Sequence, residues 1–226
     1  MITAVIFDVD GTLIDSNDAH VAAWDRAFRH FGKEFPMEKL RANIGKGADQ
    51  YLPEFLNEEE MGEIGEKIDQ YRSNLFKEEY RPHLRPFPKV RELFERIKRD
   101  GKRIALATSG KKSDLKVMKE IARIADLVDG EVTADDADES KPAPDIFEAT
   151  LAKLGPLPPG NVIAVGDTPY DAEAAKKAGV ATIGVVCGGF SEDELRRAGA
   201  IEVYKDVADC LARYDASPLG GVATSA

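Results

Sequence analysis

Cysteine is scarce in this sequence of 226 residues, which contains only Cys187 and Cys210. These two positions have neither the spacing of a metal site nor that of a redox pair. We therefore expect both thiols to be reduced and assign them no role. The sequence also lacks any apolar run of about 20 residues, the length a membrane span needs. A strand-like run begins at Ile2, which leaves no room for a signal peptide, so we expect a cytoplasmic protein.

A surplus of positive charge is absent as well, since the formal net charge is −10 at pH 7. Nucleic acids and anionic membranes bind basic surfaces, so neither is expected as a partner. The net charge does not exclude a small anionic ligand, because charges beyond a Debye length of ~8 Å are largely screened. A lysine or a cation inside a cleft acts at contact distance instead.

The first strong feature that is present is an apolar run followed by two carboxylates. The β-branched residues from Ile2 to Phe7 predict a buried strand, and Asp8 and Asp10 follow it directly. Two ionised carboxylates this close repel each other unless a cation lies between them. The end of this strand is therefore the first candidate for an active site.

The next part of the chain, up to about residue 85, predicts helices only. Behind Ser16, a candidate N-cap, apolar residues recur at helical spacing until Gly32. Further predicted helices span residues 37–41, 48–56 and 58–77. Three prolines between Arg81 and Pro88 are typical of a semi-rigid connector.

From residue 86 onward, predicted helices and strands alternate. The expected strands span residues 103–107, 130–133, 161–165, 181–186 and 201–203. Such alternation predicts right-handed crossovers and a parallel, doubly wound sheet, a Rossmann-like α/β fold. We expect a core domain made of residues 1–15 and 86–214 and an inserted all-helical cap domain at 16–85. The small and polar residues 215–226 predict a disordered tail.

Polar residues also end two later predicted strands. Thr108 and Ser109 follow strand 103–107, and Asp167 follows strand 161–165. The carboxyl ends of parallel strands meet at one edge of a sheet, so these residues are expected beside Asp8. A turn or capping role would explain a single threonine as well.

Two proline-containing segments supply further candidates. Pro142 keeps Lys141 out of a helix, so this lysine is presented from an extended segment. Thr168, Pro169 and Asp171 have the pattern of an N-cap, a first-turn proline and a capping-box acid. That pattern alone would explain Asp171 structurally.

The four segments together resemble a known family. The string Asp-Val-Asp-Gly-Thr at residues 8–12 resembles the nucleophile motif of the haloacid dehalogenase superfamily, in its phosphatase and phosphomutase branch. Segments 108–109, 140–145 and 166–171 resemble its second, third and fourth motifs in the same order. Since four motifs are far more specific than one, the sequence is identified as a member over about residues 1–212.

The resemblance implies a magnesium-dependent phosphatase that hydrolyses a small phosphate monoester through an aspartyl phosphate. Asp8 would be the nucleophile, and Asp10 the general acid and base, with a dry site raising its pKa. Mg²⁺ would be held by the side chains of Asp8 and Asp167 and the backbone carbonyl of Asp10. Asp171 would support the metal ligands from behind.

The remaining implied roles concern the substrate. Thr108, the Ser109 N–H group and Lys141 would bind the phosphoryl oxygens. Within the insertion, His20 and the loop around Lys46 resemble the cap of the β-phosphoglucomutase and phosphoglycolate phosphatase relatives. Both residues are candidate substrate contacts, although an ordinary exposed loop lysine would explain Lys46 equally well. A monomer and a homodimer are both compatible with the sequence.

Other functions remain open at this point. A sugar phosphomutase would share the aspartyl phosphate, but β-phosphoglucomutases usually carry a Glu-Asp pair where this chain has Gly166-Asp167. A phosphorylated receiver domain also places an aspartate, a hydroxyl residue and a lysine at strand ends, yet it needs neither the helical insertion nor Asp10. A dehalogenase or a purely phosphate-binding protein is disfavoured, because every position that phosphoryl transfer requires is filled.

Overall fold

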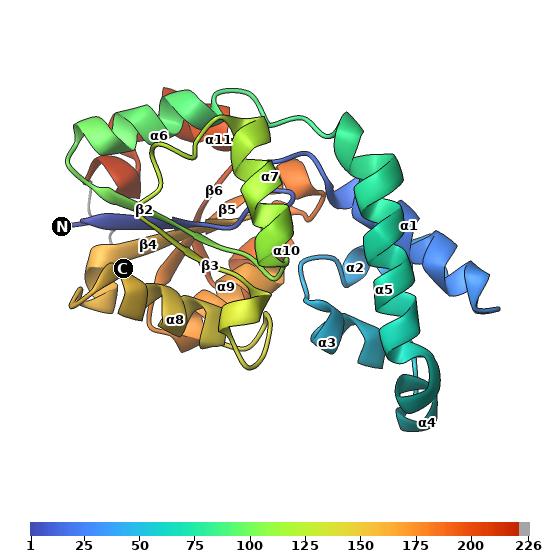
Figure 1. The fold of residues 1–226 in the computed structure, drawn as a ribbon. Coiled ribbons are helices and arrows are strands. Elements are labelled where there is room, and N and C mark those ends of the chain that lie inside the picture. Colours follow the sequence, from blue (N-terminus) through green and yellow to red (C-terminus); the bar gives the residue numbers. More distant parts are fainter. Residues whose placement is uncertain (222–226) are drawn as a thin grey trace.

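The computed structural model describes residues 1–221, and its centre is a sheet of six parallel strands in the order β3-β2-β1-β4-β5-β6 (Figure 1). The strand β1 lies between β2 and β4, so the segment that precedes Asp8 is buried on both sides. The strands are β1 (Ala4–Phe7), β2 (Arg103–Ala107), β3 (Gly130–Val132), β4 (Val162–Gly166), β5 (Ala181–Val185) and β6 (Ala200–Tyr204). The predicted parallel, doubly wound sheet is confirmed.

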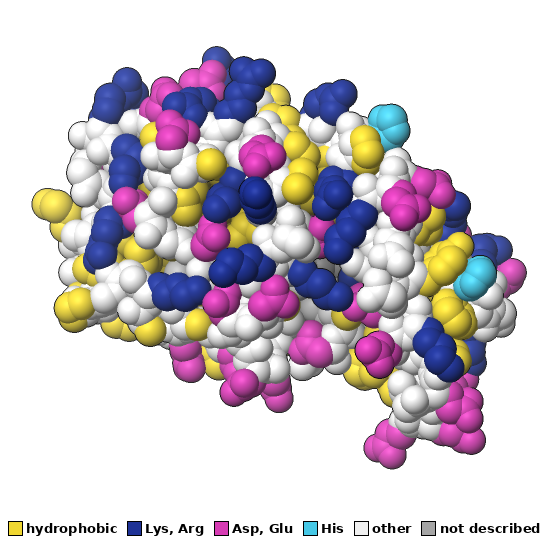
Figure 2. All heavy atoms as spheres, in the orientation of Figure 1, with side chains coloured by type: hydrophobic (Ala, Val, Ile, Leu, Met, Phe, Trp, Pro, Cys, Tyr) yellow, Lys and Arg dark blue, Asp and Glu magenta, His cyan; other side chains and the backbone are white. Residues whose placement is uncertain are grey.

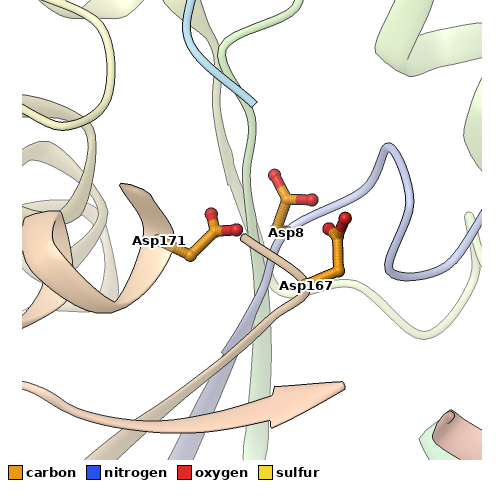
Figure 3. Close-up of side chains that lie close together, drawn as sticks. All are labelled: Asp8, Asp167 and Asp171. Atoms are coloured by element: carbon orange, nitrogen blue, oxygen red, sulfur yellow. The ribbon is translucent and has the colours of Figure 1, made fainter. Parts of the chain in front are cut away.

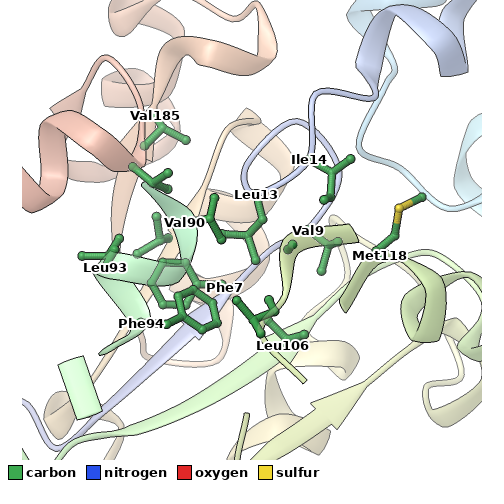
Figure 4. Packing of buried hydrophobic residues seen from close by; sticks show 14 of the residues in the cluster. Phe7, Val9, Leu13, Ile14, Val90, Leu93, Phe94, Leu106, Met118 and Val185 are labelled. Carbon is green, nitrogen blue, oxygen red and sulfur yellow. The ribbon is translucent and has the colours of Figure 1, made fainter. Parts of the chain in front are cut away.

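Helices cover both faces of this sheet (Figure 1). The helices that lie after residue 89 in the sequence are α6 (Val90–Arg99), α7 (Lys112–Ala122), α8 (Asp145–Leu154), α9 (Pro169–Lys177), α10 (Glu192–Ala198) and α11 (Val207–Ala212). Alternate residues of β1 point to opposite layers: Phe7 packs on Phe94 of α6, while Ile6 joins the cluster that contains Phe147 of α8. Figure 4 shows the first of these clusters, which extends to the residues just after Asp8. None of the helices in residues 1–221 is long and apolar enough to span a membrane.

Residues 17–83, called the helical segment below, form helices and no strand. The helices are α1 (Asn17–His30), α2 (Met37–Ala42), α3 (Ala48–Tyr51), α4 (Glu58–Glu60) and α5 (Glu66–Leu75). Two π-helical turns continue α4 and α5, so the helix predicted over 58–77 extends to Tyr80. The segment has its own cluster of buried side chains around Trp24, Phe28 and Tyr51. It lies beside the carboxyl edge of the sheet (Figure 1).

Two stretches of chain connect the helical segment to the sheet, and they run side by side. The Asp15 N–H group donates to the carbonyl of Arg85 over 3.0 Å, and the Phe87 N–H group donates to the carbonyl of Leu13 over 2.9 Å. Ile14 and Pro86 form an antiparallel bridge. The two connections therefore form a short antiparallel ribbon.

The prediction that residues 215–226 are disordered is wrong for residues 215–220. Residues 214–216 and 218–220 form single 3₁₀ turns. The Ser217 hydroxyl donates to the Tyr214 carbonyl over 2.7 Å, and Leu219 is fully buried in the main core. The buried side chains of Ser217, Pro218 and Leu219 together anchor the segment to the core. Residues 222–226 lie outside the described residues.

Positively and negatively charged side chains lie close together on the surface. On the face that Figure 2 shows, Lys and Arg side chains lie among Asp and Glu side chains. Charged side chains also pair within one helix, as Arg91 and Glu95 do in α6. Of the two free thiols, Cys210 is buried in the core, and Cys187 donates to the carbonyl of Gly11 over 3.2 Å. Burial raises the pKa of both thiols.

Candidate active site

The predicted site residues meet at the carboxyl edge of the sheet, beneath the helical segment. A pocket of about 180 Å³ lies between them. The sheet side contributes Asp8, Asp10, Thr108, Ser109 and Ser140, and the helical segment contributes His20, Trp24, Lys46, Asp69, Arg72 and Phe76. Residues as far apart in the sequence as Asp8 and Ser140 therefore face one pocket, as the strand-end argument predicts.

Lys141 is the central cation of the site and is only 1% exposed. Its ammonium donates to Asp8 Oδ1 over 2.5 Å and to the carbonyl of Ala107 over 2.8 Å. It also lies 2.7 Å from Asp171 Oδ1. Burial alone would lower the pKa of Lys141, but Asp171 and Asp8 raise it above its usual value, so the side chain stays charged.

Three carboxylates lie close to one another at this edge of the sheet, as Figure 3 shows: Asp8 at the end of β1, Asp167 at the end of β4, and Asp171 in the first turn of α9. One oxygen of each lies within 4.8 Å of the others. Asp167 is fully buried, and its oxygens accept hydrogen bonds from Thr12 Oγ1 over 2.7 Å and from Asn17 Nδ2 over 2.8 Å.

The charge of this cluster fits a divalent cation. In their ionised forms, which a cation would bind, the three carboxylates and one ammonium would together carry two negative charges in a buried space. Burial and repulsion from Asp171 raise the pKa of Asp8 to about 7, against the attraction of Lys141. Burial and the charges of Asp8 and Asp171 raise the pKa of Asp167 well above its usual value. Carboxylate oxygens are the ligands that hard divalent cations prefer, so these residues fit such an ion.

The three carboxylates are not equally free to bind a cation. Asp171 Oδ2 accepts from the N–H group of Thr168 over 3.0 Å and from its hydroxyl over 2.7 Å, while Oδ1 faces Lys141. The capping box predicted at Thr168 is therefore present, and it engages Asp171. This leaves Asp8 and Asp167 as the better ligands. The carbonyl of Asp10 accepts no backbone hydrogen bond from residues 1–221 and is available as a third.

Asp10 has a different environment from its neighbours. Its Oδ1 accepts from the Ser16 hydroxyl over 2.7 Å and lies 3.1 Å from His20 Nε2, whose ring stacks on Phe76. Burial alone would raise the pKa of Asp10, but the charge and hydrogen bond of His20, with the Ser16 hydroxyl, hold it below its usual value. The prediction of a raised pKa for Asp10 is therefore wrong. His20 is therefore a direct partner of Asp10, a contact that the sequence did not predict.

The hydroxyl residues after β2 line the same pocket. Thr108 is 3% exposed, and its Oγ1 accepts from the N–H group of Gly110 over 3.0 Å. The Ser109 hydroxyl is buried and has no hydrogen-bond partner within residues 1–221. A buried polar group without a partner indicates a missing one. An anion in the pocket would supply it.

The helical segment closes the pocket with charged side chains. Lys46 lines it, but its ammonium already donates to Glu54 Oε1 over 2.6 Å and to Asn43 Oδ1 over 2.8 Å. A substrate would have to share or displace these partners. Sequence reasoning missed Arg72, which stacks on Trp24 and donates to Asp69 over 2.6 Å.

Three supporting side chains were also missed: Thr12, Ser16 and Asn17. Ser16 lies at the N-cap of α1, as predicted, but its hydroxyl forms no cap and binds Asp10 instead. Thr12 and Asn17 reach Asp167 across more than 140 positions of sequence. Their only signal in the sequence is a place within nine residues of Asp8.

Comparison with known proteins agrees with this geometry. The family model described as haloacid dehalogenase-like hydrolase matches residues 5–185, and the chain belongs to this family. It is 30% identical to "Probable phosphatase IndB" of Dickeya dadantii, over 95% of this chain and 97% of that protein. It is also 30% identical to "Phosphorylated carbohydrates phosphatase" of Thermotoga maritima, over 89% and 94%. The crystal structure of a hydrolase from Pseudomonas syringae superimposes with a TM-score of 0.83 at 30% identity, over 95% and 98%. The predicted family and the prediction of a hydrolase are confirmed.

Proposed function

We propose that this chain is a Mg²⁺-dependent phosphatase that hydrolyses a small phosphate monoester through an aspartyl phosphate on Asp8. One observation carries the proposal: the Asp8 carboxylate lies in the pocket between the Lys141 ammonium and the Asp167 carboxylate, with Asp10 two residues away. A nucleophile, a fixed cation, a cation site and an acid/base are thus assembled at one point. The phosphatase names of the similar proteins support the same activity.

In the first half of the reaction, an Asp8 oxygen attacks phosphorus and the bond from phosphorus to the ester oxygen breaks. Asp10 gives a proton to the departing oxygen. Thr108, the Ser109 N–H group and Lys141 hold the remaining phosphoryl oxygens. When bound, Mg²⁺ supplies positive charge that screens the phosphoryl group from the carboxylates.

In the second half, water attacks phosphorus, Asp10 takes its proton, and the bond between phosphorus and Asp8 breaks. The lowered pKa of Asp10 favours the ionised carboxylate, the form that accepts this proton. The acid role requires that Asp10 carry a proton, and an incoming phosphate dianion beside it favours that form by repulsion.

Gly166 supports a hydrolase over a phosphomutase. A Cβ atom at this position would lie 2.5 Å from both Cβ and Cγ of Asp171. The Glu-Asp pair of the mutases therefore does not fit here while Asp171 holds Thr168 and Lys141. We propose that the chain lacks the second acid and transfers the phosphoryl group to water.

The affinity for Mg²⁺ should rise with pH. Protonation of Asp8, whose pKa is raised to about 7, competes with cation binding. A group with that pKa is about one-tenth ionised at about pH 6 and about nine-tenths ionised at about pH 8, so we expect at least roughly tenfold tighter binding at the higher pH. Calorimetric titration of the metal-free protein with Mg²⁺ at the two pH values measures this. Equal affinities would contradict the assignment of Asp8 as a ligand.

The function itself is tested by a phosphate balance. The purified protein is incubated with a panel of small phosphate esters, with Mg²⁺ and with a chelator. We expect inorganic phosphate equal to the alcohol released at every time point, many turnovers per chain, and no turnover with chelator. Isomerisation of a sugar monophosphate in the presence of a trace of bisphosphate, without phosphate release, would support the mutase. A single phosphate per chain would support a receiver.

A further inference from the structure

Asn17 is a buried amide that the proposed mechanism does not use. It is the first residue of α1 and is 6% exposed. Its Nδ2 donates to Asp167 Oδ2 over 2.8 Å and to the carbonyl of Gly188 over 2.8 Å. One side chain therefore joins the start of the helical segment, the end of β4 and the turn after β5.

The orientation of this amide is fixed by its partners. The Gly188 carbonyl can only accept a hydrogen bond, so the NH₂ group must face it and the adjacent Asp167 Oδ2. The amide oxygen Oδ1 is thereby turned away from both. It is buried and has no hydrogen-bond partner within residues 1–221. A buried acceptor in this position calls for a donor that a bound solvent molecule could supply.

The amide and the carboxylate are packed too closely to rearrange. A Cβ atom at Gly188 would lie 1.7 Å from Asp167 Oδ2. A Cβ atom at Gly11 would lie 2.3 Å from both Asp167 Oδ2 and Asn17 Nδ2. Thr12 holds the other oxygen of Asp167 over 2.7 Å. The carboxylate thus has one donor on each oxygen and two glycines against it, which fixes the direction of its free lone pairs.

We propose that Asn17 is a positioning residue for the cation: its Nδ2 orients Asp167, and its Oδ1 accepts a hydrogen bond from a water molecule of the cation's hydration shell. This inference rests on the proposed function. Mg²⁺ keeps several waters when it binds proteins, so acceptors beyond its direct ligands contribute to its affinity and selectivity. Removing such outer partners typically weakens metal binding about 10–100-fold.

The test measures cation affinity in the absence of substrate. For Asn17→Ala and Asn17→Ser, which cannot bridge to Asp167, calorimetry should show Mg²⁺ binding about 10–100-fold weaker than in the unmodified protein. Ca²⁺ tolerates irregular shells and bidentate carboxylates, so its affinity should fall by about threefold or less. A merely structural role for Asn17 would not change this selectivity. Thermal unfolding with chelator establishes that each variant is folded.

Asn43→Ala is the matched control. Asn43 is buried to a similar extent; its Nδ2 donates to the carbonyl of Lys39 and its Oδ1 accepts from Lys46, both within the helical segment and neither at the three carboxylates. Its removal should leave both cation affinities unchanged. Equal losses for Mg²⁺ and Ca²⁺ in the Asn17 variants, or no loss, would overturn the inference while leaving the phosphatase proposal standing. A lack of Mg²⁺ binding by the unmodified protein would overturn both.

Discussion

Asp8→Asn is expected to abolish phosphate release to the detection limit while the chain remains folded. The substitution keeps the shape of the side chain but removes the nucleophilic oxygen and one ligand of the cation. Lys141 keeps its contact with Asp171 and is not left as an unpaired buried charge. Release of p-nitrophenolate measures the loss, and the intact mass after incubation with acetyl phosphate shows whether a phosphoprotein forms.

The matched control is Asp18→Asn, which makes the same chemical change at a side chain that is 83% exposed and paired with Arg41 on the surface. It should retain full turnover.

The stability of the Asp8 variant should also depend differently on pH when chelator is present. Because burial raises the pKa of Asp8 to about 7, the folded chain binds a proton that the unfolded chain has already lost. Stability from this group is therefore present below its unfolded pKa of about 3.9 and is lost as the pH rises toward 7. In Asp8→Asn this loss of stability with rising pH should disappear. In the activity assay, formation of a phosphoprotein or normal turnover by this variant would exclude Asp8 as the nucleophile.

Asp10→Asn should slow turnover by roughly 10²–10⁴-fold, the range for loss of a general acid/base. The amide oxygen of the asparagine can still accept the hydrogen bond from the Ser16 hydroxyl. The amide can neither give a proton to the leaving oxygen nor take one from water. The loss should be smallest for p-nitrophenyl phosphate, whose leaving group needs little protonation, and largest for an alkyl ester.

The comparison of the two esters serves as the internal control. Both are cleaved by the same variant with the same cation, so a fault in folding or metal binding would reduce both rates equally. An equal loss on the two esters would mean that Asp10 does not protonate the leaving group.

The sequence predicted the elements whose signals are local. The apolar patterns predict a strand over 103–107 and helices over 145–154 and 192–198, and the bounds of β2, α8 and α10 match these ranges to the residue. Each of these elements has a clear apolar pattern and a glycine or proline close to one end or both. The capping box at Thr168 was predicted for the same reason, because all of its atoms lie within four residues.

The parts that could not be predicted depend on contacts across the chain. The pKa of Asp10 is lowered because a helical turn brings His20 back to it, and no spacing rule gives the sign of a balance between burial and one neighbouring charge. For Lys46, the sequence left a substrate contact and an ordinary loop lysine equally open, and it gave no sign that Glu54 would hold this side chain at the pocket wall. The small and polar composition of residues 215–226 gave no sign that Leu219 would pack into the main core.

The antiparallel ribbon at Leu13–Asp15 and Arg85–Phe87 also makes the strand pairing of the sheet independent of the length of the helical segment. Because its two strands are hydrogen-bonded to each other, the chain leaves the sheet and returns to it at the same point. The sheet is therefore insensitive to what the excursion contains, and the entropy of closing such an excursion grows only slowly with its length. A helical segment of another size or sequence can be exchanged here without changing any strand pairing. The coupling between the two parts is thus confined to side chains of α1, since His20 and Asn17 contact Asp10 and Asp167, and only an exchange that keeps these two side chains would leave the chemistry at Asp8 unchanged.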